Sequence, residues 1–157
     1  MNATAEPIAP PATIRRQRSK PMCSIGAACS LVDKNPDQVL SLIEEGQLPW
    51  AWDVSSNPRR SRRKEIRILP AAVAAYMTGR ECALTWEGVL DVLLPHDEPT
   101  LVTKDITRAL NVSSTLVFSL VKQKELRPCS TWQTGPGHSA RFPRQCFVDF
   151  LERRRWP

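Results

Sequence analysis

The feature that most constrains the fold of this chain is a short helical pattern that occurs twice. Val39, Leu42 and Ile43 stand at i, i+3 and i+4, and Leu48 follows, so these side chains share one face of a helix. The same spacing returns 78 positions later at Val117, Leu120, Val121 and Leu126. A helix this short is not stable alone, and a pattern written twice indicates two copies of one small folding unit.

Each copy sits in the context of a second short helix. Asn35 and Pro36 are a candidate N-cap and first-turn residue, and Gly46 marks the end of the helix. Ser24 is the candidate N-cap of the preceding helix, whose expected inward residues are Ala28, Leu31 and Val32. Two short helices with a tight break between them, the second with a polar outer face, are typical of a helix-turn-helix.

The chain then changes to a hairpin pattern. An aromatic segment at residues 50–54 and an alternating segment at residues 65–69 flank a loop that is rich in turn-forming and basic residues, and together they predict a β-hairpin, or wing. The loop cations are Arg59, Arg60, Arg62, Arg63 and Lys64. Such density is favourable against phosphates, although a solvated surface loop would have the same composition.

A third helix is predicted to close the first unit. Pro70 occupies its first turn, Val73, Tyr76 and Met77 share one face, and Gly79 ends it. We expect Trp50 and Trp52 to pack beneath this helix, because so small a core needs its largest side chains.

An acidic segment joins the two copies. Residues 81–99 carry a net charge of −5, whereas residues 100–157 carry +6. Thr85 is a candidate cap for a helix here, and its apolar residues exceed what a free linker needs: Trp86, Val89, Leu90, Leu93 and Leu94. We expect this connector to dock between the units or to mediate dimerisation.

The second copy follows the order of the first. Thr103 is the candidate cap of a helix with Ile106, Ala109 and Leu110 inward, and the second helix spans residues 114–124. A shorter hairpin is expected at residues 132–142, and Pro143 opens a last helix with Phe147, Phe150 and Leu151 inward. The predicted fold is mainly α with small β-hairpins (α+β). It comprises a disordered basic arm (1–21), a winged helix-turn-helix unit (22–80), an acidic helical connector (81–99) and a second such unit (100–157).

Composition excludes several classes of function. Five cysteines without a secretory signal argue against a disulfide framework, and no Cys or His spacing suits zinc. The chain has no Gly-rich phosphate loop, no His-Glu-x-x-His and no nucleophile with a base in reach. We therefore predict no enzyme activity, no cofactor and no metal. Because no run reaches the length of a membrane span, we expect a cytoplasmic protein.

Three segments of the first unit carry a resemblance to a known family. Ser24-Ile-Gly-Ala-Ala, Pro36-Asp-Gln-Val-Leu-Ser-Leu-Ile-Glu-Glu-Gly-Gln-Leu-Pro and Arg67-Ile-Leu-Pro-Ala-Ala-Val-Ala-Ala-Tyr-Met resemble the excisionase-like winged-helix domain of the MerR superfamily. Residues 103–110, 117–126 and 142–151 resemble it more weakly. The resemblance implies DNA binding, with the second helix of each unit in the major groove and the wing on the backbone or minor groove. This chain departs from the usual pattern of the family because it carries two such domains in tandem.

The candidate DNA-contacting residues fall into three groups. On the second helices they are Asp37, Gln38, Ser41, Ser114, Thr115, Ser119 and Lys122, and Gln38 could read adenine bidentately. Phe118 is expected in the core. On the wings and nearby backbone they are Arg59, Arg60, Arg62, Arg63, Lys64, Arg67, His138, Ser139, Arg141 and Arg144. On the arm they are Arg15, Arg16, Arg18 and Lys20, although a solubilising tail is an equally good interpretation of that segment.

The predicted function is double-stranded DNA binding, as a transcription regulator or an excision (recombination directionality) factor of a phage or mobile element. The alternative is a protein-interaction or replication accessory module, in which one unit docks a protein or mediates dimerisation. Besides DNA, the expected partners are therefore a second copy of the chain, as a dimer or a filament along DNA, or a recombinase or replication protein. No membrane and no small-molecule substrate are expected.

Overall fold

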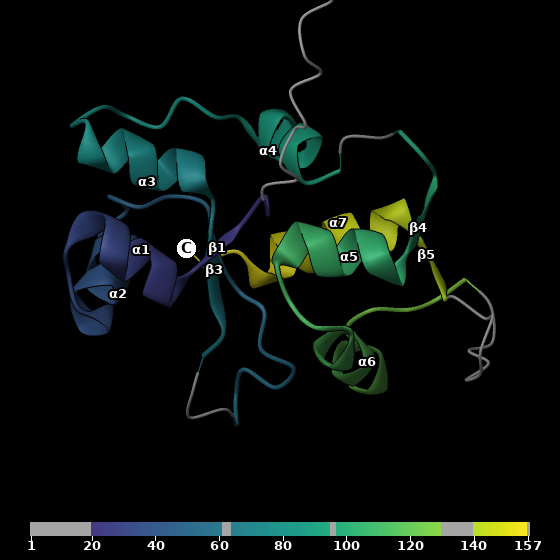
Figure 1. Cartoon of the computed structure of the whole chain (residues 1–157). Helices are drawn as coiled ribbons and strands as arrows, with labels where there is room; N and C mark the ends of the chain where they lie inside the picture. Colours follow the sequence, from purple (N-terminus) through teal and green to yellow (C-terminus); the bar gives the residue numbers. More distant parts are fainter. Residues whose placement is uncertain (1–19, 61–63, 95–96, 130–139, 157) are drawn as a thin grey trace, which may run out of the picture.

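The computed structural model describes residues 20–60, 64–94, 97–129 and 140–156. Within these ranges the chain forms seven helices and two small antiparallel sheets (Figure 1). This mixture of helices and short strands agrees with the predicted α+β class. Residues 1–19 of the predicted arm and the predicted tip of the second hairpin lie outside the described residues.

The first unit contains three helices around a three-stranded sheet. Its elements are β1 (Cys23–Ser24), α1 (Ile25–Val32), α2 (Pro36–Glu44), β2 (Ala51–Asp53), β3 (Ile66–Ile68) and α3 (Pro70–Met77). The strand order is β1-β3-β2, and Ile68 pairs with Cys23 on one side and with Ala51 on the other. The predicted hairpin is confirmed, whereas β1 was not expected, because two residues are too few to show alternation.

Local capping fixes the two helices of the first unit. The Ser24 hydroxyl accepts the Ala27 N–H at 3.2 Å. Asn35 and Gln38 cap α2 reciprocally: Asn35 Oδ1 accepts the Gln38 N–H at 2.9 Å, and Gln38 Oε1 accepts the Asn35 N–H at 3.0 Å. Both predicted caps are confirmed, and the reciprocal pair is the arrangement that satisfies two free donors at once.

The second unit repeats this order of elements. After the connector helix α4 (Trp86–Leu93) come β4 (Thr100–Val102), α5 (Thr103–Leu110), α6 (Ser114–Lys122), β5 (Arg141–Pro143) and α7 (Arg144–Arg154). β4 and β5 pair antiparallel, Leu101 opposite Phe142, as β1 and β3 do. The counterpart of β2 lies largely outside the described residues, but Cys129 donates its N–H to the Arg141 carbonyl at 2.7 Å.

The backbone shows the repeat more sharply than the side chains do. Asp33 and Asn111, which end α1 and α5, both have a φ of 52°. Gly46 and Lys124, which follow α2 and α6, have φ values of 75° and 60°. Members of each pair are 78 positions apart. Left-handed residues are uncommon outside glycine, so their recurrence at one offset indicates the same helix-break-helix geometry twice.

The two units share a hydrophobic core. One cluster joins Trp50, Trp52 and Leu69 of the first unit to Val89 and Leu93 of α4 and to buried residues of α5, α6 and α7. The connector therefore docks, as predicted, against both units (Figure 1). A second cluster lies under α1, α2 and α3. The expectation that the two tryptophans pack beneath α3 is wrong, because they face the other unit.

Four other local expectations are also wrong. Leu31, Met77 and Phe118 were expected inward, but their exposed fractions are 51%, 56% and 40%. In α1 and α3 the buried positions are instead held by the small residues Ala28, Ala72 and Val73. In addition, Val102 rather than Thr103 is the N-cap of α5, and the Asp105 carboxylate accepts its N–H at 3.0 Å.

Among the described residues, none of the helices combines the length and the apolar character that crossing a bilayer requires.

Candidate nucleic-acid interface

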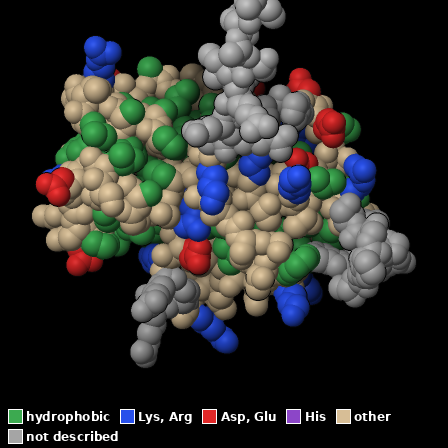
Figure 2. All heavy atoms as spheres, viewed as in Figure 1, with side chains coloured by type: hydrophobic (Ala, Val, Ile, Leu, Met, Phe, Trp, Pro, Cys, Tyr) green, Lys and Arg blue, Asp and Glu red, His purple; other side chains and the backbone are tan. Residues whose placement is uncertain are grey.

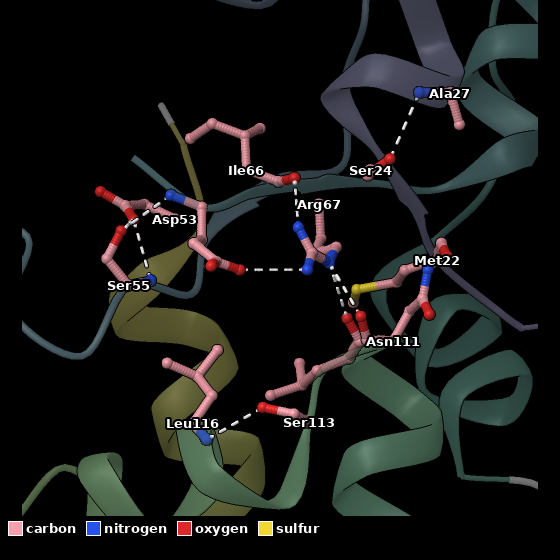
Figure 3. Close-up of polar contacts among 12 residues, drawn as sticks. Met22, Ser24, Ala27, Asp53, Ser55, Ile66, Arg67, Asn111, Ser113 and Leu116 are labelled. Carbon is pink, nitrogen blue, oxygen red and sulfur yellow. Dashed lines mark hydrogen bonds and ion pairs between the residues drawn. The ribbon is translucent and has the colours of Figure 1, made fainter. Parts of the chain in front are cut away.

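Basic residues gather in the β2–β3 loop of the first unit, residues 54–65, and a polar network closes the root of this loop. Asp53 Oδ1 accepts the Ser55 N–H at 3.0 Å and also the Ser55 hydroxyl proton. Ser55 Oγ in turn accepts the Glu65 N–H at 2.9 Å, and the Glu65 carbonyl accepts the Val54 N–H at 2.8 Å. Figure 3 shows Asp53 and Ser55 at this root. The loop therefore leaves the sheet in a fixed direction.

Three loop cations lie in the described part of the loop, and all three are exposed: Arg59, Arg60 and Lys64. Lys64 Nζ sits 4.4 Å from the centre of the Trp156 ring, a cation–π contact that leaves the residue at the surface. Figure 2 shows blue Lys and Arg side chains along the lower edge of the molecule. The predicted contacts Arg62 and Arg63 lie outside the described residues.

Arg67 has a structural position rather than a surface one. Its side chain is 13% exposed, and Nε donates to the Leu110 and Asn111 carbonyls at 3.1 and 3.2 Å. Nη2 pairs with Glu65 at 3.1 Å. Figure 3 shows the guanidinium between β3 and the end of α5. Because its donors satisfy the last carbonyls of that helix, we leave Arg67 out of the candidate interface.

A second arginine holds the loop from the other unit. Arg154, in the last turn of α7, is 8% exposed. Its Nη1 donates to the carbonyls of Asp53 and Ser55 at 3.3 and 3.0 Å, and its Nη2 lies 3.5 Å from Glu125 Oε1. Sequence reasoning missed this residue, because no local pattern distinguishes it from Arg153 and Arg155 in the same basic run.

The residues after α7 extend the same contact. Trp52 and Arg155 form an antiparallel bridge, and Trp156 donates its N–H to the Ala51 carbonyl at 2.8 Å. The Arg155 guanidinium lies 4.0 Å from the centre of the Trp50 ring. Arg154 and Arg155 thus both contact the first unit and help to hold the two units together.

Helix α2 presents the expected polar residues, but internal bonds occupy two of them. Asp37, Gln38 and Ser41 are all exposed. Gln38 Oε1 belongs to the N-terminal cap, and the Ser41 hydroxyl donates to the Asp37 carbonyl at 3.1 Å. A bidentate contact from Gln38 to adenine would require this cap to open. The helix also ends in Glu44 and carries no Lys or Arg.

Helix α6 offers a more favourable face for an anionic partner. Ser114, Thr115 and Lys122 are exposed and Ser119 is half-buried. The helix contains no acidic residue, and Lys122 occupies its last turn. Phe118 lies on this exposed side, where the expectation placed it in the core, so an apolar contact to a thymine methyl becomes possible there.

The remaining predicted contacts are scattered. Arg141 and Lys20 are exposed, whereas Arg144 is half-buried and donates to the Leu94 carbonyl at 3.5 Å. Arg15, Arg16, Arg18, His138 and Ser139 lie outside the described residues. The β2–β3 loop and α6 lie toward the same lower side of the molecule, whereas α2 lies at the edge of the first unit that is farther from α6 (Figure 1).

The cysteines are free thiols. Burial raises the pKa of Cys23, whose Sγ also donates to the Ile68 carbonyl at 3.3 Å. Cys129 is exposed, and the other three are half-buried. Across the described ranges, no three His, Cys, Asp or Glu side chains gather in a way that would hold a metal ion.

Comparison of the chain with known protein families, with curated proteins and with solved structures finds no match.

Proposed function

We propose that this chain is a double-stranded DNA-binding protein built from two winged helix-turn-helix units. The observation that carries the proposal is the repeated geometry: two capped short helices, a left-handed break, and a strand before the first helix that pairs with the strand before the third. A helix-turn-helix presents its second helix to the major groove. In this chain that helix is α2 in the first unit and α6 in the second.

Charge supports a polyanionic partner. The chain carries a net charge of +6, and exposed cations occupy the β2–β3 loop and the end of α6. Phosphate contacts from such residues supply most of the affinity in non-specific DNA binding. The exposed hydroxyls of Ser114 and Thr115 offer hydrogen bonds to bases or phosphates without a fixed sequence preference.

For the biological role, we propose a transcription regulator or an excision factor of a phage or mobile element. The support is the resemblance of residues 24–28, 36–49 and 67–77 to excisionase-like members of the MerR superfamily. Both roles need a small protein that binds a specific duplex and carries no catalytic centre.

The proposal is tested by fluorescence anisotropy with a labelled 30-base-pair duplex of random sequence. We expect binding by the wild-type chain, and a loss of more than about three orders of magnitude in affinity near 0.1 M salt when Arg59, Arg60, Arg62 and Arg63 are replaced by serine, roughly eightfold for each lost phosphate contact. Arg80→Ser, an exposed cation after α3, is the control and should bind nearly as the wild type. Equal DNA affinity of the wild-type chain and the variant with four serine substitutions would contradict the proposal.

A second candidate function rests on the apolar surface of the first unit. Leu31 on α1 and Met77 on α3 are more than half exposed, and Figure 2 shows green hydrophobic side chains over the region of α1, α2 and α3. Together with the acidic end of α2, this surface suits a protein rather than DNA. The first unit would then dock a recombinase, a replication protein or a second copy.

The two candidates make different demands on these residues. Replacing Leu31 and Met77 by serine should leave DNA affinity unchanged if the first unit faces a protein. Sedimentation equilibrium of the wild type and this double variant would then show whether the partner is a second copy of the chain. Retention of the same monomer-only profile in both would exclude self-association as the role of this surface.

A further inference from the structure

We infer that the β2–β3 loop of the first unit and helix α6 of the second unit form one continuous DNA-contacting surface. This composite surface comprises Arg59, Arg60 and Lys64 on the loop and the exposed residues Ser114, Thr115 and Lys122 on α6. Ser119 is left out of this surface because it is half-buried and its hydroxyl donates to the Thr115 carbonyl at 3.1 Å. The inference rests on the proposed DNA binding and specifies how DNA is engaged: the two units read one uninterrupted site rather than two half-sites a helical turn apart.

The first observation is that α6 is tied to the loop strands at its N-terminal side. Arg67, on β3 directly after the loop, donates to the carbonyls of Leu110 and Asn111 at 3.1 and 3.2 Å. Asn111 stands two residues before Ser113, the N-cap of α6, and its side-chain amide donates to the Met22 carbonyl at 3.1 Å. Figure 3 shows Arg67, Asn111 and Ser113 in one group below β3.

The second observation is a matching tie at the C-terminal side of α6. Glu125 donates its N–H to the Leu120 carbonyl of α6 at 2.9 Å, and its carboxylate pairs with Arg154 at 3.5 Å. Arg154 in turn holds the carbonyls of Asp53 and Ser55, where the loop begins. The residues before α6 are therefore joined to the end of the loop, and the residues after α6 are joined to its beginning.

These ties set the relative position of the loop and the helix. Figure 1 shows the loop and α6 on the same lower side of the molecule. The shared core prevents the two units from moving independently of each other. A linked pair of units that reads separated half-sites needs about 34 Å between its recognition helices. Here the basic loop of one unit instead lies on the same side of the molecule as the second helix of the other, and the residues that flank both are bonded to each other (Figure 1).

Charge selects the same pair of elements. Helix α2 contains Asp37 and Glu44 and no cation, whereas α6 contains Lys122 and no acid. The acids near the composite surface are both paired: Glu65 with Arg67, and Glu125 with Arg153 and Arg154. A duplex placed with α6 in its major groove would therefore meet the loop cations on the adjoining backbone without facing an unpaired carboxylate from these elements.

The test uses the full chain and a duplex selected from a random-sequence pool, trimmed by one base pair at a time from each end. We expect full affinity to persist down to a duplex of roughly one helical turn plus a few flanking base pairs. On that shortest duplex, Arg60→Ala and Lys122→Ala should each weaken binding about eightfold near 0.1 M salt, the contribution of one phosphate contact. The control Arg80→Ala should change it less than twofold.

Two results would overturn the inference. In the first, affinity falls abruptly when the duplex is shortened below about two helical turns, and on the shortened duplex only one of the two substitutions, Arg60→Ala or Lys122→Ala, still weakens binding. The two units would then read separate half-sites. If hydroxyl-radical footprinting shows two protected patches with an unprotected turn between them, the conclusion is the same. Failure to retain any duplex from the pool would instead refute the proposed DNA binding, and the composite surface with it.

Discussion

The contact between Arg154 and the loop root provides a sharp test of how the units are joined. Arg154→Met removes the guanidinium but keeps an aliphatic stem to fill the space beside Phe150, whose ring centre lies 5.5 Å from the guanidinium carbon. The Asp53 and Ser55 carbonyls then lose their charged donor inside the protein. Each such hydrogen bond contributes roughly 1.5 kcal/mol or more when it is buried.

The expected loss of unfolding free energy is therefore about 3 kcal/mol. The ion pair with Glu125 adds little to this figure, because the Glu125 side chain is 31% exposed and solvent screens it. With a urea m-value of about 2 kcal/mol/M, the midpoint of unfolding should fall by roughly 1.5 M. Circular dichroism at increasing urea concentration measures this shift directly.

The neighbouring residue is the matched control. Arg153 contacts the same Glu125, both through the carboxylate at 3.6 Å and through the carbonyl at 3.0 Å, but its side chain is 52% exposed. Arg153→Met should therefore cost less than about 1 kcal/mol. Equal midpoints for the two variants would refute the conclusion that Arg154 is the residue that holds the loop root.

Three further predictions follow from the packing and the backbone. Trp52 Nε1 donates to the Leu151 carbonyl at 3.0 Å across the units, so Trp52→Phe should lower the free energy of unfolding in urea by about 2 kcal/mol. Both units should still unfold in one transition, and two transitions would argue against a shared core. Because φ is positive at both Gly46 and its counterpart Lys124, Gly46→Ala should lower the free energy of unfolding in urea by about 1 kcal/mol, whereas Lys124→Gly should raise it. Effects of the same sign would contradict the structural repeat. Because burial raises the pKa of Cys23, a smaller fraction of this thiol is ionised near pH 8. Mass spectrometry should therefore show that iodoacetamide labels Cys23 more slowly than the exposed Cys129, and equal rates would contradict this expectation.

Local signals in the sequence were sufficient for most helix boundaries. The caps at Ser24, Asn35 and Thr85 and the left-handed stops at Gly46 and Gly79 act within four residues. Their chemistry is therefore readable from the chain itself. The repeat was visible for the same reason, because it preserves an apolar spacing that short helices need.

What the sequence did not show is how the units meet. The Trp52–Leu151 and Arg154–Ser55 contacts each join residues 99 positions apart, and no periodicity predicts such pairs. The tryptophans were assigned to the nearest helix, although their aromatic surface is needed where the two units share a core. Short strands such as β1 and β4 were missed because each exists only through pairing with a distant strand.

The candidate site was predictable in composition and not in arrangement. The cations of the β2–β3 loop stand out as a run, and their exposure in the described part agrees with that prediction. Arg67 belongs to the same basic region but is drawn inward by the free carbonyls at the end of α5. Which arginines face solvent therefore depends on acceptors that lie elsewhere in the chain.

The most direct test of DNA binding is the salt dependence of affinity for a 30-base-pair duplex. If six to eight cations reach phosphates, log K should fall against log salt concentration with a slope of about −5 to −7, a loss of roughly three orders of magnitude or more between 50 and 200 mM salt. The variant with serine at Arg59 and Arg60 should show a slope smaller by about 2. A slope near zero for the wild-type chain would contradict the proposal that this protein binds DNA through its basic surface.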